Sequence, residues 1–266
     1  MDQKGESGWF ASGNAYENYV GRWSRPIAYM FVQWLAQSAG LRWVDVGCGT
    51  GALTEVVLAK ADPSKVIGVE PSASYLERAQ ASIKDPRVEF YVGDAQSLPL
   101  EDHQVDTVVS GLVLNFIPDK RRALAEMQRI VVPGGTIALY VWDYAGEMQL
   151  MRYFWNGVGE LFPDAKNKDE GIRFFDCKPN PLVDLFCSAG LRSVETCALD
   201  VPTVFTNFED YWSPFLGGQG PAGTYCVSLS ENDRERLRRH LRDSLPINAD
   251  GTVALIARAW AVRGRT

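Results

Sequence analysis

The stretch Val44-Asp45-Val46-Gly47-Cys48-Gly49-Thr50-Gly51 joins a short apolar run to three glycines at alternate positions. The run 43–46 predicts a buried strand, and the residues behind the glycines, 52–61, predict a helix. Glycine lets the backbone turn tightly and approach a ligand without a clash at Cβ. A helix N-terminus also presents N–H groups and a positive dipole end to an anion. We therefore expect a ligand-binding turn here.

Strands and helices alternate on both sides of this turn. Further strands are predicted at 65–70, 88–92, 105–110 and 136–142, and further helices at 25–39, 72–83 and 119–131. Such alternation is typical of βαβ units and of a parallel sheet buried on both faces. After Tyr144 the regular alternation of strands and helices ends. The later segments are a helical, aromatic-rich stretch at 144–180, a helix at 181–189, a strand at 192–201, an aromatic segment at 205–215, a glycine-rich loop at 217–223, a helix at 231–245 and a strand at 252–262.

The predicted fold class is therefore α/β, with a doubly wound, Rossmann-like sheet and an inserted helical cap rich in aromatic residues. We expect a single domain over residues 1–266, with its core at about 26–143 and 181–266. An N-terminal lid is expected at about 10–40, and the cap at about 144–180 together with 205–225.

Composition excludes several classes of protein. Of the 266 residues 46% are hydrophobic, which supplies a sizeable core and argues against global disorder. The net charge of -6 argues against a nucleic-acid binder, which needs a basic excess. The five cysteines show no C-x-x-C spacing, so we expect no metal site and a reduced, cytoplasmic protein. No leader and no apolar run of membrane-spanning length are recognised, so no membrane partner is expected.

Polar residues follow the predicted strands at the edge that carries the glycine turn. Glu70 ends the second strand, where a carboxylate can accept two hydrogen bonds from a ribose diol. Asp94 follows the third strand and could accept a bond from an adenine amino group, with the N–H of Ala95 donating to the ring. Ser110, Gly111 and Leu112 leave the fourth strand, which flanks the switch point of a doubly wound sheet and forms the other wall.

As an ordered set, these elements resemble the class I S-adenosylmethionine (SAM)-dependent methyltransferases. The resemblance covers roughly residues 20–142 and looks closest to the small-molecule group that includes ubiquinone and menaquinone methyltransferases. It is carried by Asp45 to Gly51, Glu70, Gly93-Asp94-Ala95, the segment Asp106 to Asp119, and Pro133-Gly134-Gly135. It implies a seven-stranded sheet whose last strand is antiparallel, and SAM as the cofactor.

The resemblance also implies roles for individual residues. Gly47, Gly49 and Gly51, with Cys48 inside the loop, would cradle the methionine part of SAM, and Asp45 would lie near its amino group. Glu70 would hold the ribose, Pro71 would lie beside the adenine, and Asp94 and Ala95 would read its edge. In related enzymes the N-terminal helical segment folds over the cofactor. The candidates for that lid are Tyr16, Tyr19, Arg22 and Trp23, of which Tyr19 and Arg22 are assigned to cofactor binding.

Methyl transfer from a sulfonium is an in-line displacement that needs alignment and exclusion of water, and a base only if the acceptor must lose a proton. The two histidines, His103 and His240, are expected at the surface, and no catalytic constellation is recognised. Asp143, after the fifth strand, is the one candidate for a polar contact to the acceptor. Aromatic residues suit an apolar or planar acceptor. The candidate walls are Trp142, Tyr144, Phe154, Trp155, Phe174, Phe175, Tyr211, Trp212, Phe215 and Tyr225.

Two other functions stay open. Ala52 could occupy the last place of a relaxed dinucleotide pattern, so the glycine turn alone is compatible with an NAD(P)-dependent oxidoreductase. A methyltransferase-like protein that binds SAM or a partner without catalysis is the other alternative. The sequence favours a small organic acceptor as partner, and leaves its identity, the methylated atom and the oligomeric state open.

Overall fold

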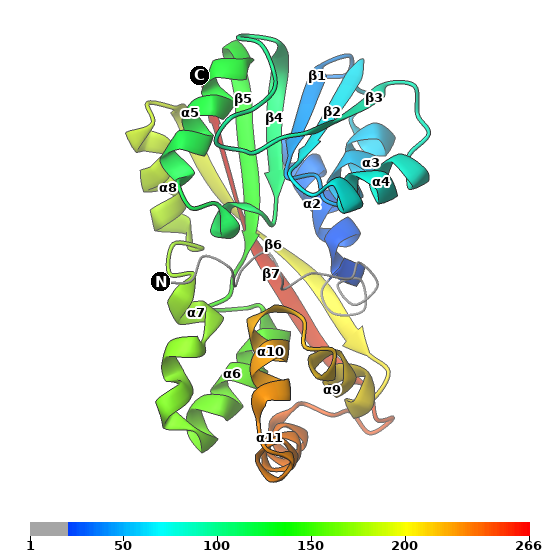
Figure 1. Cartoon of the computed structure of the whole chain (residues 1–266), viewed down its shortest axis with the longest axis vertical. Helices are drawn as coiled ribbons and strands as arrows, with labels where there is room; N and C mark the ends of the chain where they lie inside the picture. The colour runs from blue at the N-terminus through cyan, green and yellow to red at the C-terminus, as the bar shows by residue number, and fades with distance from the viewer. Residues whose placement is uncertain (1–20) are drawn as a thin grey trace. The chain divides into compact units, whose positions relative to one another are not determined.

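The computed structural model describes residues 21–266, and within them the chain divides into two compact units (Figure 1). The sheet unit comprises residues 24–141, 176–199 and 260–266. The cap unit comprises, within the described residues, 21–23, 142–175 and 200–259. The expectation of a single domain over 1–266 stays a prediction.

The strands form one seven-stranded sheet in the order β3-β2-β1-β4-β5-β7-β6. The pairings β1–β2, β1–β4, β2–β3 and β4–β5 are all parallel. The N–H of Thr266 donates to the carbonyl of Gly135, and the N–H of Asp143 donates to the carbonyl of Arg258. β7 therefore runs antiparallel to β5, and the predicted fold class is confirmed. The strand bounds are β1 Arg42–Val46, β2 Lys65–Glu70, β3 Val88–Val92, β4 Val105–Gly111, β5 Val131–Trp142, β6 Arg192–Phe205 and β7 Val253–Arg265.

The core of the sheet unit lies between this sheet and the helices that connect its strands. β1 buries four of its five residues, as expected for a central parallel strand. On α5, residues Ala123, Leu124, Met127 and Ile130 form the buried stripe that helical spacing predicts. The helices of the sheet unit are α2 Ser24–Leu35, α3 Ala52–Lys60, α4 Ala73–Ser82, η2 Leu114–Phe116, α5 Lys120–Ile130 and α8 Pro179–Ser188.

The cap unit is helical and aromatic, apart from the ends of β6 and β7 that belong to it. The rings of Phe154 and Phe215 stack with their centroids 4.5 Å apart. Ser230 begins the last helix by accepting the N–H of Asp233, as its sequence predicts. The helices are η1 Gly21–Trp23, α6 Gln149–Leu161, η3 Pro163–Lys168, α7 Glu170–Arg173, α9 Phe208–Leu216, α10 Gly220–Ser228 and α11 Glu231–Ser244. None of the helices within residues 21–266 has the length and apolar character of a membrane span.

Several predicted boundaries were wrong. The helix expected at 25–39 ends at Leu35, and the strand expected at 192–201 continues to Phe205. β5 begins at Val131 rather than at Thr136, because the ladder with β4 jumps from Val105↔Val131 to Thr107↔Thr136 and accommodates the extra residues as an irregularity. The glycine-rich run 217–223, expected to be a loop, contains the start of α10 at Gly220. Pro221 occupies the first turn of that helix, where its fixed φ favours helix initiation.

Candidate functional site

The glycine turn between β1 and α3 has the left-handed backbone that its sequence predicts. The φ angles of Gly47, Gly49 and Gly51 are 75°, 54° and 94°, a region that favours glycine. A Cβ at Gly47 would lie 2.6 Å from Val113, and one at Gly51 would lie 2.5 Å from Ile83. A Cβ at Gly49 would meet nothing within 4 Å. The outer two glycines are thus needed for packing, whereas Gly49 exposes its backbone to open space where a ligand could approach.

Asp45, on β1 beneath this turn, is a buried carboxylate with one unpartnered oxygen. Its exposed fraction is 1%, and Oδ2 accepts a 2.7 Å hydrogen bond from the Thr54 hydroxyl. Oδ1 is buried and has no hydrogen-bond partner within residues 21–266. Burial, reinforced by the charge of Glu70, raises the pKa of Asp45 to about 7. A cation placed beside Oδ1 would offset both the missing hydrogen bond and the cost of ionisation.

Glu70, the last residue of β2, reaches the same turn. Its Oε2 accepts the N–H of Gly49 at 3.1 Å, and its Oε1 accepts the N–H of Ser72 at 3.0 Å. Burial raises the pKa of Glu70, which is 8% exposed, although these backbone hydrogen bonds favour the carboxylate. The two bonds fix the carboxylate at the carboxyl edge of the sheet. Cys48, inside the turn, is also buried, and burial raises the pKa of its thiol.

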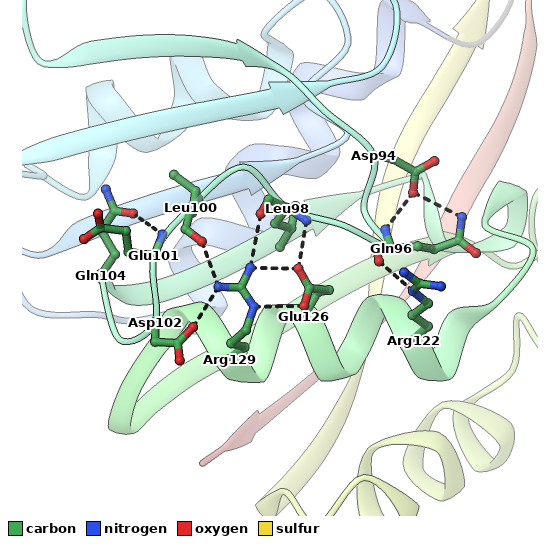
Figure 2. A network of polar contacts seen from close by, with 10 residues as sticks. All are labelled: Asp94, Gln96, Leu98, Leu100, Glu101, Asp102, Gln104, Arg122, Glu126 and Arg129. Carbon is green, nitrogen blue, oxygen red and sulfur yellow. Dashed lines mark hydrogen bonds and ion pairs between the residues drawn. The ribbon is translucent and has the colours of Figure 1, made fainter.

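Asp94 lies in the segment after β3, and its carboxylate is held by the side chain two residues on. Figure 2 shows the Asp94 Oδ1 accepting both the backbone N–H of Gln96, at 2.7 Å, and its Nε2, at 3.1 Å. The Gln96 Oε1 accepts the N–H of Asp119, the residue that caps α5. The Nε of Arg122 donates to the Gln96 carbonyl at 2.9 Å. Gln96 therefore ties the predicted adenine-reading carboxylate to the helix that follows β4.

A second arginine fastens the rest of this segment to α5 (Figure 2). Arg129 donates to the carbonyls of Leu98 and Leu100 and forms ion pairs with Glu126 and Asp102. Sequence reasoning found neither Gln96 nor Arg129, because the contacts join parts of the chain about thirty residues apart and leave no periodic pattern.

The segment after β4 was expected to form the other wall of the site. Ser110 is buried and donates its hydroxyl proton to the Val46 carbonyl at 2.7 Å, so its side chain joins β4 to β1. A Cβ at Gly111 would lie 2.5 Å from the Tyr140 hydroxyl. Leu112 has a φ of 63°, an unfavourable value for a residue with a side chain. Such strain is often found beside ligand sites.

The aromatic residues expected to line an acceptor site are packed against one another in the cap unit. The Tyr211 hydroxyl donates to the Leu150 carbonyl, and the Trp155 Nε1 donates to the buried Glu170 carboxylate at 2.8 Å. Each of the seven principal candidates is at most 5% exposed: Trp142, Tyr144, Phe154, Trp155, Tyr211, Trp212 and Phe215. They form the core of this unit, and their contact with an acceptor stays a prediction.

Asp143 stabilises a turn. Its Oδ2 accepts the N–H of Glu147 at 2.9 Å, and its carbonyl accepts the N–H groups of Gly146 and Met148. A role toward an acceptor stays a prediction. Of the remaining expected residues, Pro71 and Asp94 are exposed and Ala95 is partly buried. Tyr16 and Tyr19 lie outside the described residues. Arg22 and Trp23 form η1 in the cap unit, and the glycine turn belongs to the sheet unit.

An apolar groove of about 310 Å³ lies elsewhere in the sheet unit, between the start of α5 and α8. Leu114, Leu182 and Leu185 are among the residues that line it. None of the residues expected to bind a cofactor is among them. We therefore place the candidate site by its polar groups and glycine geometry rather than by this groove.

Known proteins that are similar to this chain match the segment that carries the glycine turn and the strand-end carboxylates. The family model for a methyltransferase domain matches residues 44–139, the segment from β1 to β5. A demethylmenaquinone methyltransferase of Staphylococcus carnosus is 30% identical over 171 residues, which cover 59% of this chain and 70% of the relative. The chain belongs to the class I SAM-dependent methyltransferase family. The recognition made from the sequence is confirmed.

This methyltransferase is also similar to other curated proteins, over smaller parts of their lengths. A demethylmenaquinone methyltransferase of Lactococcus lactis is 33% identical over 162 residues, 50% of this chain and 64% of that protein. An uncharacterized 37.1 kDa protein in transposon TN4556 of Streptomyces fradiae is 36% identical over 98 residues, 36% of this chain and only 28% of its own length. The chain thus spans less than two thirds of these curated relatives.

Solved structures agree at the level of the fold. The YcgJ protein of Bacillus subtilis superposes with a TM-score of 0.59 at 17% identity, covering 91% of this chain and 98% of that one. A possible histamine N-methyltransferase of Thermotoga maritima gives a TM-score of 0.54 at 22% identity, covering 95% of each chain. At such identities the likeness establishes the architecture alone.

Proposed function

We propose that this protein transfers a methyl group from SAM to a small organic acceptor. The single observation that carries the proposal is that the Oδ1 of Asp45, buried beneath a three-glycine turn, has no hydrogen-bond partner in the described part of the chain. An unpaired buried carboxylate oxygen is costly, and the ammonium group of the methionine part of SAM is a partner of the right charge. Family membership and the relatives named as methyltransferases support the same reading.

The residues present fit the cofactor that the family implies. Asp45 would bind the ammonium group, the backbone at Gly49 would lie against the methionine part, and Glu70 would accept the ribose hydroxyls. Asp94 and the N–H of Ala95 would read the adenine edge, beside Pro71. When bound, SAM supplies a methyl group on a positively charged sulfur, an activated donor for displacement.

The protein's own contribution would be alignment and exclusion of water. Methyl transfer is an in-line displacement, so orientation of the acceptor supplies much of the rate enhancement. Aromatic residues of the cap unit would favour an apolar or planar acceptor. Neither histidine is proposed as a base: the His103 ring lies 2.9 Å from the Val131 carbonyl, and the His240 ring lies 3.3 Å from Glu160. The small organic acceptor and the cytoplasmic location remain predictions.

Thermal unfolding with S-adenosylhomocysteine (SAH) and with NAD(P), side by side, tests the cofactor. A ligand at about 100 times its dissociation constant stabilises by roughly 2.7 kcal/mol, which raises the midpoint of a protein of this size by roughly 5–11 °C. We expect the rise with SAH alone. A rise with NAD(P) alone would favour the oxidoreductase alternative and overturn the proposal. Transfer of labelled methyl groups from SAM to candidate acceptors then separates an enzyme from a protein that only binds SAM.

Replacement of Glu70 tests the site itself. Two charge-assisted hydrogen bonds to the ribose are lost in Glu70→Ala, so SAH affinity should fall by roughly 100-fold in calorimetric titration. Glu89→Ala is the matched control, because Glu89 forms an exposed ion pair with Lys65 on neighbouring strands of the same sheet. Circular dichroism checks that both variants fold. Equal affinities in Glu70→Ala and the wild type would rule out the assigned ribose contact.

A further inference from the structure

Thr54 joins the two elements on either side of the glycine turn. It is the third residue of α3, and its hydroxyl donates to the Oδ2 of Asp45 on β1 at 2.7 Å. Both residues are buried, with exposed fractions of 0% for Thr54 and 1% for Asp45. Asp45 is itself fixed between two strands, since it pairs with Gly68 of β2 and Val109 of β4. The hydrogen bond therefore spans the base of the turn, and it lies within the sheet unit alone.

This hydrogen bond determines which oxygen of Asp45 is left for a ligand. A hydroxyl has one proton to donate, and in a helix a threonine commonly donates it to a carbonyl one turn back. The Thr54 hydroxyl donates it to Asp45 instead. A short hydrogen bond from a hydroxyl to a carboxylate is stronger than one between neutral groups. Oδ2 is thereby occupied, and Oδ1 is the oxygen without a partner within residues 21–266.

Thr107 of β4 is equally buried in the same unit, with an exposed fraction of 0%. Its Oγ1 has no hydrogen-bond partner within the described residues. The sheet unit thus accommodates a buried threonine whose hydroxyl forms no hydrogen bond there, at the cost of an unsatisfied polar group. The contact of Thr54 with Asp45 is therefore not a general consequence of burying a threonine, and Thr107 offers a matched control for the loss of a buried hydroxyl.

We propose that Thr54 is a positioning residue for the cofactor, which holds Asp45 so that its Oδ1 accepts the ammonium group of SAM. This inference rests on the proposed function. Because Oδ2 already accepts the proton of the Thr54 hydroxyl, a proton that neutralises Asp45 goes to Oδ1. Oδ1 then carries an O–H donor, and an ammonium group has donors only. The proton and the cofactor therefore compete for one atom, and Thr54 determines which atom that is.

Thr54 also acts on the ionisation of Asp45. Burial raises the pKa of Asp45 to about 7, the hydroxyl and the N–H of Thr54 lower this pKa, and the charge of Glu70 raises it. The other titratable group that interacts with Asp45 is the Cys48 thiol in the turn, and burial raises the pKa of that thiol so that it stays neutral. Loss of the Thr54 hydroxyl should therefore leave less of the Asp45 carboxylate ionised at neutral pH.

The first measurement is the titration of Asp45 in the ligand-free protein, by NMR of carboxyl-labelled aspartate, with Asp45→Asn to identify the signal. Thr54→Val removes the hydroxyl and keeps the shape of the side chain, Thr54→Ser keeps the hydroxyl, and Thr107→Val is the matched control. We expect the midpoint to rise by roughly one to two pH units in Thr54→Val, the equivalent of a hydrogen bond to a charged group, and to stay at the wild-type value in the other two. Thr54→Ala replaces the valine variant if that variant fails to fold. An unchanged midpoint overturns the proposal, whether or not the protein binds SAM.

The second measurement compares SAH with its deaminated analogue, which keeps the carboxylate and lacks the ammonium group. In calorimetric titration at pH 7, SAH affinity should be roughly 5- to 50-fold lower in Thr54→Val, and affinity for the analogue should be unchanged or raised. The difference in SAH affinity should shrink as the pH rises, because Asp45 then ionises in both proteins. Thr54→Ser and Thr107→Val should bind both ligands as the wild type does.

The two ligands separate positioning from a merely structural role of Thr54. Equal losses of affinity for SAH and for the analogue in Thr54→Val would show a general loosening of the turn and overturn the proposal. Failure of the wild type to bind SAH would refute the proposed function, whereas the NMR titration, which needs no ligand, still decides whether Thr54 controls Asp45.

Discussion

Asp45 of the sheet unit and Glu170 of the cap unit are the two most buried carboxylates within residues 21–266, and they differ in their hydrogen-bond partners. Asp45 and Glu170 are 1% and 3% exposed, and burial raises the pKa of both to about 7. Glu170 accepts the indole N–H of Trp155, and the charges of Arg173 and Arg152 further favour its ionised form. Asp45 accepts the Thr54 hydroxyl through Oδ2, and its Oδ1 has no partner within residues 21–266. The nearby charge of Glu70 further disfavours ionisation of Asp45.

Glu170 therefore joins α7 to α6, whereas we assign the missing partner of Asp45 Oδ1 to a ligand. A raised pKa is common to both and therefore does not identify a site by itself. The two residues differ in one oxygen: Glu170 accepts the Trp155 N–H, whereas the buried Oδ1 of Asp45 accepts from no donor within residues 21–266.

The largest expected effect is on stability, in Glu170→Gln. The pKa of Glu170 is raised above its unfolded value of about 4.5, so its contribution to stability is fully present below that pH and is lost as the pH rises through about 7. The amide keeps an oxygen that accepts the Trp155 N–H but never ionises. Above pH 8 the variant should exceed the wild type by roughly 3 kcal/mol, the equivalent of the pKa difference, and near pH 4 the two should be equal.

Denaturant unfolding at pH 4, 6 and 8 measures this effect, and titration with SAH supplies the functional control. SAH affinity should match that of the wild type, because Glu170 is already paired within the cap unit. If Glu170→Gln lowered SAH affinity and left stability unchanged, Glu170 would be a ligand-binding group, and its assignment as a purely structural carboxylate would be wrong.

The next effect is on binding, in Asp45→Asn. The amide has the size of the carboxylate but no charge for an ammonium group, so SAH affinity should fall by roughly 10- to 100-fold. In the wild type the ligand binds the ionised form of Asp45, so SAH affinity should rise with pH toward and through about 7. In Asp45→Asn this part of the pH dependence should vanish. A pH profile shared by both proteins would show that another group is responsible.

Asp45 was predicted from the sequence as a site residue, whereas the buried Glu170 was not predicted. Glu70 was identified because it ends a strand of recognisable pattern, and parallel strands bring their carboxyl ends to one edge. Asp45 was identified through the family resemblance of the glycine turn. All seven strands follow from apolar runs and turn residues near them in sequence. Glu170 was missed because its burial depends on the packing of α7 against α6, which local sequence does not encode. The start of α10 was missed because the glycines of residues 217–223 favoured the prediction of a loop. Pro221, whose position favours a helix start, was the signal for the helix.

The ion pair of Arg22 with Asp210 and the contacts of the segment after β3 lie beyond sequence reasoning for the same reason. Arg22 and Asp210 are 188 residues apart, and Arg129 and Leu98 are 31 apart. No periodicity connects such pairs. A sequence shows which residues can form ion pairs, but only the fold shows which of them lack a partner.

The smallest expected effect concerns Gln96, which positions Asp94 without touching a ligand itself in our assignment. Gln96→Ala removes the Nε2 bond to Asp94 and the Oε1 bond to the N–H of Asp119, and keeps the backbone N–H bond. The exposed Nε2 bond only helps to position Asp94, so its loss should cost about 1 kcal/mol of binding and lower SAH affinity by roughly 5-fold. A carboxylate that holds its position less well should also discriminate less between adenine, whose amino group it binds, and hypoxanthine, which has a carbonyl there.

The ratio of affinities for SAH and its inosine analogue is therefore the decisive readout, because a general loosening of the segment would weaken both ligands alike. Gln104→Ala is the matched control: Gln104 accepts the N–H of Glu101 in the same segment, away from Asp94 (Figure 2). We expect the ratio to drop in Gln96→Ala and to stay at the wild-type value in Gln104→Ala. Equal losses for both ligands in Gln96→Ala would reduce Gln96 to a structural link between the segment and α5, and would leave Asp94 oriented by its backbone contacts alone.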